Sequence, residues 1–355
     1  MYCVTSCKFK VLPRNHFIDL LKLVAAFFVI CIHTNTTAKI DGFEQGSFSF
    51  IIDNIARFAV PFFFITSGYL INFKNNTKLY KRLAIIFVTY LLWCGVFILI
   101  RRYNDLNYPV FVFAEDHSLN TTINRIYKLF VFGYERHLWF FPAYIIGVLL
   151  VKVLHQHMKL LASVAIVLYV LGVTGQQLRF IYPDHVNFLL QPVQQWLQET
   201  QFTRDGLFLA FPMIALGNIL SRQNIKTTQS TLPFLITLSI GLTIAQYYEC
   251  LYFINNHGAK VSEYYLTTPL LVTSILLIGI SKPYIGIKLR RITRLSGGVY
   301  LLHPLFMYLL LIKYNHLFQM EWFPYLYTLL LFGLSLLTAW ILSLIKPLRP
   351  LIFYQ

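Results

Sequence analysis

An apolar stretch near the start of the chain carries three ionisable side chains, Asp19, Lys22 and His33. Ionisable groups are costly in an apolar environment, so residues of this kind are functional candidates by default. If residues 17–34 form a helix, a separation of eleven positions returns Lys22 and His33 to nearly the same face, about 16 Å apart along the axis. Asp19 falls within about 60° of that face. We therefore expect all three side chains to point the same way, with His33 at the opposite end from the other two.

The residue types determine which chemistry this face can perform. A histidine titrates near neutrality, so His33 can act as a general base toward a hydroxyl or form a covalent intermediate itself. Lys22 offers a positive charge to an anionic ligand. A structural interpretation stays open beside these, with Asp19 and Lys22 as an ion pair at i, i+3 and His33 as an interfacial residue.

The elements that position these residues are predicted from composition. Of the 355 residues, 57% are hydrophobic and only 12% are charged, and the mean hydropathy is +0.60. A water-soluble domain usually carries about twice that charged fraction. The apolar stretches are long and continuous, which favours transmembrane helices over the alternating strands of a barrel. We predict an all-α, polytopic transmembrane bundle that forms one unit over residues 1–355. Its expected spans are 17–34, 49–71, 83–100, 137–153, 160–178, 204–220, 232–253, 265–281, 295–312 and 324–346.

The charged residues between these spans orient the chain. The net charge is +16, and the basic residues cluster in alternate turns, such as 72–82 and 282–294, which contain no Asp or Glu. The loops on the other side hold most of the acidic residues. The positive-inside rule then places both termini in the cytoplasm. We interpret the basic excess as a topology signal, and we expect no nucleic-acid partner.

Two further features argue against other classes of protein. The N-terminal segment has the charge pattern of a signal peptide, but we expect no cleavage because Asp19 and Lys22 interrupt the apolar run. The five cysteines are scattered, without the spacing of a metal site or of a disulfide framework. We therefore predict no bound metal.

Five motifs occur in order along the chain. The first joins Lys22 to His33 through ten intervening residues, within the pattern Ile-Asp-x-Leu-Lys-x-x-Ala. The others are Arg57-Phe-Ala-Val-Pro-Phe-Phe-Phe-Ile-Thr-Ser67-Gly68-Tyr69, His137-Leu-Trp139-Phe-Phe, Arg204-Asp-Gly-Leu-Phe and Tyr300-Leu-Leu-His303. Together these motifs resemble the acyltransferase 3 family over nearly the whole chain. The resemblance is closest to the branch that contains an enterobacterial common antigen O-acetyltransferase and the membrane halves of some vancomycin-resistance racemases.

The resemblance implies an O-acetyltransferase of the bacterial inner membrane, in contact with membrane lipid. Such an enzyme would move an acetyl group from cytoplasmic acetyl-CoA to a hydroxyl of a cell-envelope glycan or of a lipid-linked sugar precursor. The matched motifs imply catalytic roles for His33, Asp19 and Arg57. They imply donor binding by Lys22, Ser67, Gly68 and Tyr69, and acceptor binding by His137, Trp139, Arg204 and His303.

The roles in the second expected span have structural alternatives. Arg57 can stabilise an oxyanion or hold His33 in place, or it can pair with Asp53 four residues earlier. Gly68 can admit a cofactor, or it can let two helices pack closely.

Alternatives also exist for the later motifs and for the chain as a whole. Trp139 can stack on a sugar or lie in the interfacial aromatic belt, and His303 can act in catalysis or be a polar core residue. A transporter or flippase of a glycan precursor would also have ten spans with buried charges. A catalytically silent membrane sensor is a third hypothesis.

Overall fold

Every regular element in the described part of the chain is a helix, and no strand occurs among those residues. The computed structural model therefore confirms the predicted all-α fold. It describes residues 14–34, 44–103, 129–130, 133–135, 137–178, 206–223, 225, 230–259, 261–314, 316–317, 320 and 322–349.

The helices follow the predicted spans closely. Two π-helical segments, Thr174–Leu178 and Gly206–Ala210, extend α8 and precede α10, respectively. The α-helices are α1 (His16–Thr34), α3 (Phe48–Ala56), α4 (Ala59–Leu70), α5 (Asn76–Tyr103), α7 (Phe140–Leu154), α8 (Met158–Val173), α10 (Phe211–Arg222), α11 (Thr231–His257), α12 (Thr268–Ser281), α13 (Arg290–Thr293), α14 (Ser296–Lys313) and α15 (Phe323–Leu344).

Each predicted span corresponds to an apolar helical segment, but these segments differ in length. Six are long and apolar enough to cross a membrane, so the chain is a multi-pass membrane protein: His16–Thr34, Phe48–Leu70, Asn76–Ile100, Met158–Gln177, Thr231–His257 and Leu326–Leu344. Four are shorter: Phe140–Leu154, Gly206–Arg222, Thr268–Ser281 and Ser296–Leu310. The prediction of ten membrane crossings is therefore not confirmed as a count.

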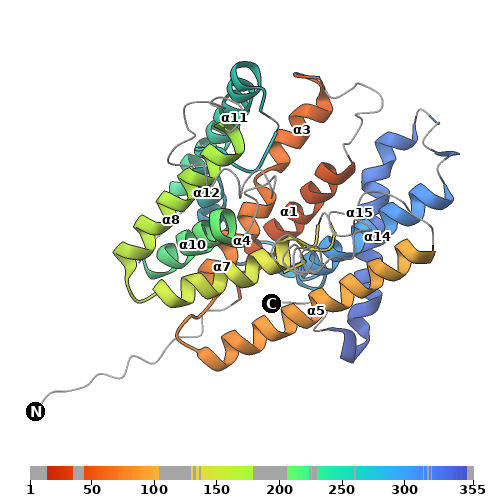
Figure 1. Ribbon diagram of the computed structural model, residues 1–355, viewed down its shortest axis with the longest axis horizontal. Helices are drawn as coiled ribbons and strands as arrows, with labels where there is room; N and C mark the ends of the chain where they lie inside the picture. Colours follow the sequence, from red (N-terminus) through yellow and green to blue (C-terminus); the bar gives the residue numbers. More distant parts are fainter. Residues whose placement is uncertain are drawn as a thin grey trace, which may run out of the picture.

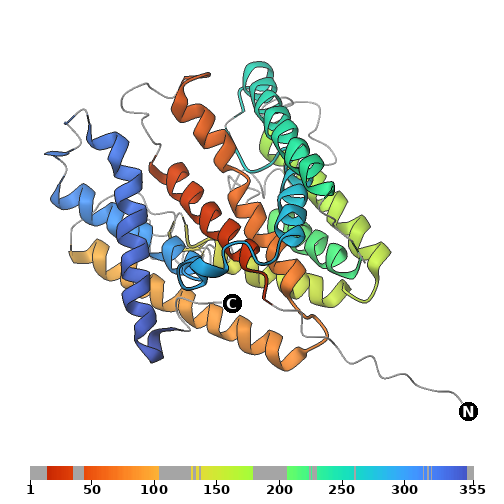
Figure 2. The ribbon, with the colours of Figure 1, turned by 180° about the vertical axis from the view of Figure 1, so that it is seen from behind.

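Helix α1 lies in the middle of the bundle, between α14 and α15 on one side and α8, α10, α11 and α12 on the other, with α5 below it (Figures 1 and 2). It packs against α4, α14, α3 and α15. Ala25, Ala26 and Ile30 of α1 are fully buried in these contacts. Because so much of its surface faces other helices, α1 can carry polar side chains that neighbouring helices satisfy.

The second predicted span is broken in the middle, where the sequence predicted one continuous helix. Helix α3 ends at Ala56, a turn contains Arg57 and Phe58, and α4 begins at Ala59. Pro61 explains the break, because a proline has no N–H to donate to the carbonyl four residues earlier, here that of Arg57. The break places Arg57 at a bend inside the bundle.

Helices α4 and α10 cross at very short range through two glycines. A methyl group built on Gly68 would lie 2.0 Å from the carbonyl oxygen of Ile214, and one on Gly217 would lie 2.0 Å from that of Ile65. Small residues allow helix backbones to approach closely in this way. The packing alternative for Gly68 is thus realised in the fold.

Hydrogen bonds between turns show which turns lie at the same end of the bundle. At the basic end, the amide of His16 donates to the carbonyl of Pro283 at 2.9 Å, and Lys152 donates to the carbonyl of Phe73 at 2.7 Å. At the other end, Gln45 donates to Asn255 at 2.7 Å. The basic turns therefore meet at one end, as the alternation of charge along the sequence predicts.

We expect Gly217→Ala to destabilise the protein, because the new methyl group would force α4 and α10 apart. Overpacking of this kind costs about 1–3 kcal/mol. Thermal unfolding of the detergent-solubilised protein, followed by circular dichroism, measures the loss. Gly241→Ala on α11 is the matched control, because a methyl group there meets nothing within 4 Å. Equal unfolding temperatures for the two variants would contradict this account of the crossing.

Candidate functional site

Three histidines that are far apart in the sequence meet inside the bundle. The ring centroid of His33, on α1, lies 5.2 Å from that of His303, on α14. The ring of His137, in the turn before α7, lies 5.9 Å from that of His303. His137 is 2% exposed and His303 is fully buried. We call these three residues the histidine cluster.

Neighbouring side chains hold the histidine cluster in place. The hydroxyl of Tyr300, one turn before His303, donates to the backbone carbonyl of His137. The ring of Phe97, on α5, meets that of His137 edge-on at 5.0 Å. Gly133 opens the turn with φ +79°, and a methyl group there would lie 2.5 Å from the backbone nitrogen of Trp139. The turn that presents His137 therefore needs a glycine at this position.

Two imidazole nitrogens of the histidine cluster lack polar contacts in the described part of the chain. The Nε2 atoms of His137 and His303 have no hydrogen-bond partner among those residues. Buried polar atoms are nearly always hydrogen-bonded, so such atoms indicate a place for water or for a ligand. Across the described residues, no group of His, Cys, Asp and Glu side chains is arranged to hold a metal ion.

A second buried cluster, the Arg57 network, joins three charged residues. The guanidinium of Arg57 donates to both carboxylate oxygens of Asp53, through contacts of 2.7 to 3.2 Å, and to Glu263 at 2.9 Å. Asp53 and Glu263 are each 2% exposed. The i, i+4 pairing with Asp53 is therefore present, and a second carboxylate is added to it from a distant part of the sequence.

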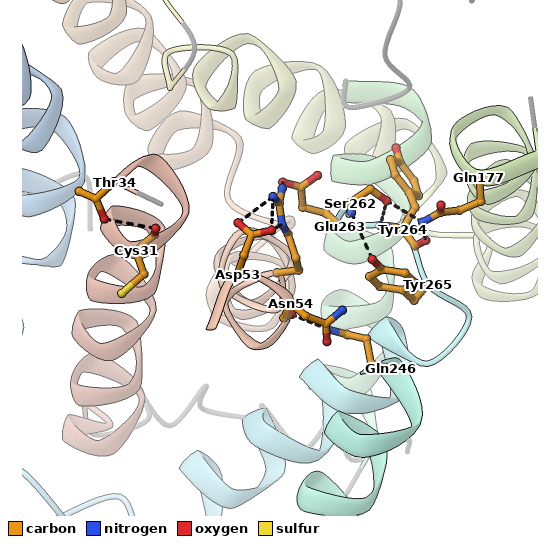
Figure 3. Close-up of polar contacts among 11 residues, drawn as sticks. Cys31, Thr34, Asp53, Asn54, Gln177, Gln246, Ser262, Glu263, Tyr264 and Tyr265 are labelled. Atoms are coloured by element: carbon orange, nitrogen blue, oxygen red, sulfur yellow. Dashed lines mark hydrogen bonds and ion pairs between the residues drawn. The ribbon is translucent and has the colours of Figure 1, made fainter. Parts of the chain in front are cut away.

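Glu263 reaches Arg57 because its loop enters the bundle. Gln177 donates to the hydroxyl of Ser262 and to the carbonyl of Tyr264, both at 2.8 Å. Tyr169 donates to the carbonyl of Tyr265 at 2.7 Å. Figure 3 shows this loop beside the carboxylates of Asp53 and Glu263. Side chains of α8 and of the π-helical segment after it thus satisfy backbone groups that would otherwise be buried without partners.

A third cluster, which we call the cation cluster, lies around the buried Lys22 near the N-terminal end of α1. The charges that act on Lys22 are those of Asp19, Arg82 and Arg14. Arg294 belongs to the same cluster, because the charges of Arg14 and Asp19 act on it. Partial burial and the charges of Arg14 and Arg290 lower the pKa of Arg294, and the charge of Asp19 opposes that shift. The Nε atoms of Arg82 and Arg294 have no hydrogen-bond partner among the described residues. The cation cluster is thus Arg14, Lys22, Arg82 and Arg294.

The structure brings some of the predicted catalytic residues together and separates others. Asp19 lies fourteen residues before His33, about 21 Å away along α1, so it cannot contact that imidazole. Its ion pair is with Arg14, at 2.6 Å, and not with Lys22. Arg57 contacts two carboxylates, and none of its hydrogen bonds goes to His33 within the described part of the chain.

The remaining predicted residues lie in different surroundings. Gly68 faces α10, while Ser67 and Tyr69 on either side of it are half-buried. The ring of Trp139 packs edge-on against Phe64 at a centroid distance of 6.2 Å. Arg204 lies outside the described residues. The donor and acceptor roles of these residues stay predictions.

Sequence reasoning missed the inward position of Glu263 and the parts of Arg14 and Arg294 in the cation cluster. The alternation of charge along the sequence predicts Glu263 on an outer loop with most of the other acidic residues, although two tyrosines follow it directly. Those neighbours, Tyr264 and Tyr265, are fully buried, so an aromatic pair beside an acid was the available signal. Arg14 and Arg294 were counted only as topology signals.

We expect Arg57→Met to destabilise the protein by about 3–5 kcal/mol, because it leaves two buried carboxylates without their cation. Unfolding of the detergent-solubilised variant measures the effect. Lys288→Met, which removes a charge from an exposed side chain, is the control and should change stability little. An Arg57→Met protein with native stability and a defect only in activity would favour the catalytic interpretation of Arg57.

Comparison with known proteins places these clusters in a family. A family model described as an acyltransferase domain matches residues 15–344. An amino-acid racemase of Enterococcus faecalis is 29% identical over 309 residues, which cover 82% of this chain and 41% of the racemase. A serine/alanine racemase of Enterococcus gallinarum is 26% identical over 308 residues, which cover 82% and 40%. The chain thus spans about two fifths of the length of these relatives. No solved structure gave a significant match.

The family match runs from the residue before α1 to the last residue of α15. It therefore contains the histidine cluster, the Arg57 network and nearly all of the cation cluster. The racemases also agree with the branch that the sequence motifs indicate. This chain belongs to the acyltransferase 3 family of multi-pass membrane proteins.

Proposed function

We propose that this protein is a membrane-bound O-acyltransferase. It moves an acetyl group from cytoplasmic acetyl-CoA to a hydroxyl of a cell-envelope glycan, or of a lipid-linked sugar precursor, at the bacterial inner membrane. One observation carries the proposal: α1 presents the cation cluster at one end and the histidine cluster at the other. A donor with a charged head and a distant reactive group needs these two features at a fixed separation.

The cation cluster suits the phosphates of acetyl-CoA. Asp19 is the one acid among the charges that act on Lys22 and Arg294, so an anion would relieve the repulsion among the four basic residues. Guanidinium groups bind phosphate through paired donors, and the Nε atoms of Arg82 and Arg294 are available for this. Lys22 is about 16 Å from His33 along the helix axis, and an extended pantetheine arm covers a distance of that order. Ser67 and Tyr69, near the same end of α4, are proposed as further donor contacts.

The histidine cluster suits the chemical step. His33 takes the proton from the acceptor hydroxyl while that oxygen attacks the thioester carbonyl. The new C–O bond forms, the C–S bond breaks, and the electron pair leaves with the CoA sulfur. Buried aromatic side chains such as Phe97 and Tyr300 keep water from competing as the acceptor. His137 and His303 are proposed to contact the acceptor through their Nε2 atoms, which have no partner among the described residues.

The Arg57 network supports the site from a distance. Its geometry favours a structural role, because two carboxylates already occupy the guanidinium. Trp139 and Arg204 are proposed on the acceptor path because they belong to the matched motifs. The names of the racemases specify no acyl acceptor, so the choice of a glycan hydroxyl rests on the motif resemblance.

We expect His33→Ala to abolish acyl transfer without loss of the fold, because His33 would be the base at the reacting atoms. Thiol release from acetyl-CoA by purified protein in nanodiscs, with a cell-envelope glycan extract as acceptor, measures the transfer. Loss of general base catalysis lowers the rate by about 10²–10⁴-fold. Release that is unchanged in His33→Ala would refute the mechanism. No release and no acetyl-CoA binding by the wild type would instead favour the transporter hypothesis.

We expect Lys22→Gln to weaken donor binding more than it slows the chemical step, because Lys22 is distant from His33. The KM for acetyl-CoA should rise about tenfold or more, as expected for a lost charge-assisted contact. Steady-state thiol release at several salt concentrations measures KM and its salt dependence, which should be weaker in the variant. Lys313→Gln, at the opposite end of the bundle, is the control, because its side chain is exposed. An unchanged KM in Lys22→Gln would remove Lys22 from the donor site.

A further inference from the structure

The histidine cluster contains more titratable groups than a single general base requires. His33 is only half-buried, whereas His137 and His303 are enclosed by the bundle. Burying an imidazole costs free energy unless its nitrogens are hydrogen-bonded. The Nε2 atoms of His137 and His303 lack such partners in the described part of the chain. A purely structural role would leave that cost without compensation, so the two buried histidines call for another explanation.

We propose that His303, backed by His137, is the proton relay partner of His33. The inference rests on the proposed acyl transfer at His33 and adds a role for a residue that was otherwise expected to contact the acceptor or to be a polar core residue. The centroid distances of 5.2 and 5.9 Å let a proton pass between adjacent rings directly or through one water molecule. An imidazole suits this task because it can donate with one nitrogen and accept with the other.

The relay accounts for the proton of the acceptor hydroxyl at each step of the reaction. The acceptor hydroxyl gives its proton to His33 as its oxygen bonds to the acyl carbon. In the same step His33 passes a proton from its other ring nitrogen to His303, which leaves His33 neutral beside the tetrahedral intermediate. The C–S bond then breaks, the sulfur leaves with the electron pair, and the proton returns through His33 to the CoA thiolate. No other reactant is consumed.

The groups around His303 favour one mobile proton. His33 faces it from α1, His137 from the turn before α7, and Tyr300 from its own helix. Positive charges on adjacent imidazoles repel each other, so a second proton is disfavoured. Two carboxylates interact with neighbours of the histidine cluster. Glu135 accepts a hydrogen bond from Tyr308 of α14 at 3.1 Å, and the charge of Glu263 acts on Tyr300.

The test is a proton inventory of thiol release from acetyl-CoA in mixtures of H2O and D2O. The protein is in nanodiscs, with the glycan extract as acceptor. The wild type should give a curved plot, because more than one proton is in flight. His303→Gln should lower kcat about 10²-fold or more with little change in the KM for acetyl-CoA, and its plot should become straight. His316→Gln, which changes an exposed histidine, should match the wild type.

The outcomes separate the relay from the proposed function. Thiol release that is absent in the wild type, or unchanged in His33→Ala, would overturn the acyl transfer and the relay with it. An active wild type with a straight plot would overturn the relay alone, and this result does not depend on any variant folding. A curved plot retained in His303→Gln would also overturn it. If His303→Gln does not fold, His137→Gln carries the same comparison, and a lowered kcat with a less curved plot supports the relay.

Discussion

The cost of an unpaired charge in the apolar interior organises the polar structure of this protein. Arg57 lies at a bend in the middle of a span, where its charge would be very costly without a partner. Asp53 is in range simply because it lies one helical turn earlier. Glu263 is far from Arg57 in the sequence, so its loop must enter the bundle to reach the guanidinium. The loop in turn needs Gln177 and Tyr169 to satisfy its backbone carbonyls. One buried cation thus determines the course of a loop and the polar faces of its neighbours.

The same cost determines which side chains surround the two polar ends of α1. Its two ends are polar, while its middle is a row of buried alanines and aliphatic residues. Polar ends alone would suit a simple membrane anchor, but here both ends are enclosed by other helices. The charges of Arg14 and Arg82 act on Lys22, and that of Arg14 acts on Arg294. At the other end of α1, two buried histidines lie close to His33. Helix α4, which packs against α1, is itself held close to α10 by the glycine crossing.

The sequence predicted what depends on local pattern and missed what depends on tertiary contact. Helical periodicity placed Lys22 and His33 on one face, and the alternation of basic turns placed those turns at one end of the bundle. The break at Arg57 was missed, although Pro61 marks it. Glu263 lies 206 residues from Arg57, and no periodicity connects them. The order and direction of the predicted spans put His33 and His137 at the same end of the bundle. The contact of His303 with both rings joins three distant segments, and the motifs alone do not predict it. Asp19 shares that face in the helical projection, and it lies at the other end of α1 from His33, as its position fourteen residues earlier predicts.

A single helix that bears both the cation cluster and the histidine cluster fixes the relation between them. Eleven residues set the separation, and a rotation of about 100° per residue sets the direction. The separation cannot drift as neighbouring helices move, because α1 is continuous from His16 to Thr34. A donor held at Lys22 would therefore always present its reactive end at the level of His33. No single helix fixes the acceptor side in this way, because His303 comes from α14 and His137 from the turn before α7. Variation among members of such a family can then alter the acceptor side while the donor geometry on α1 stays the same.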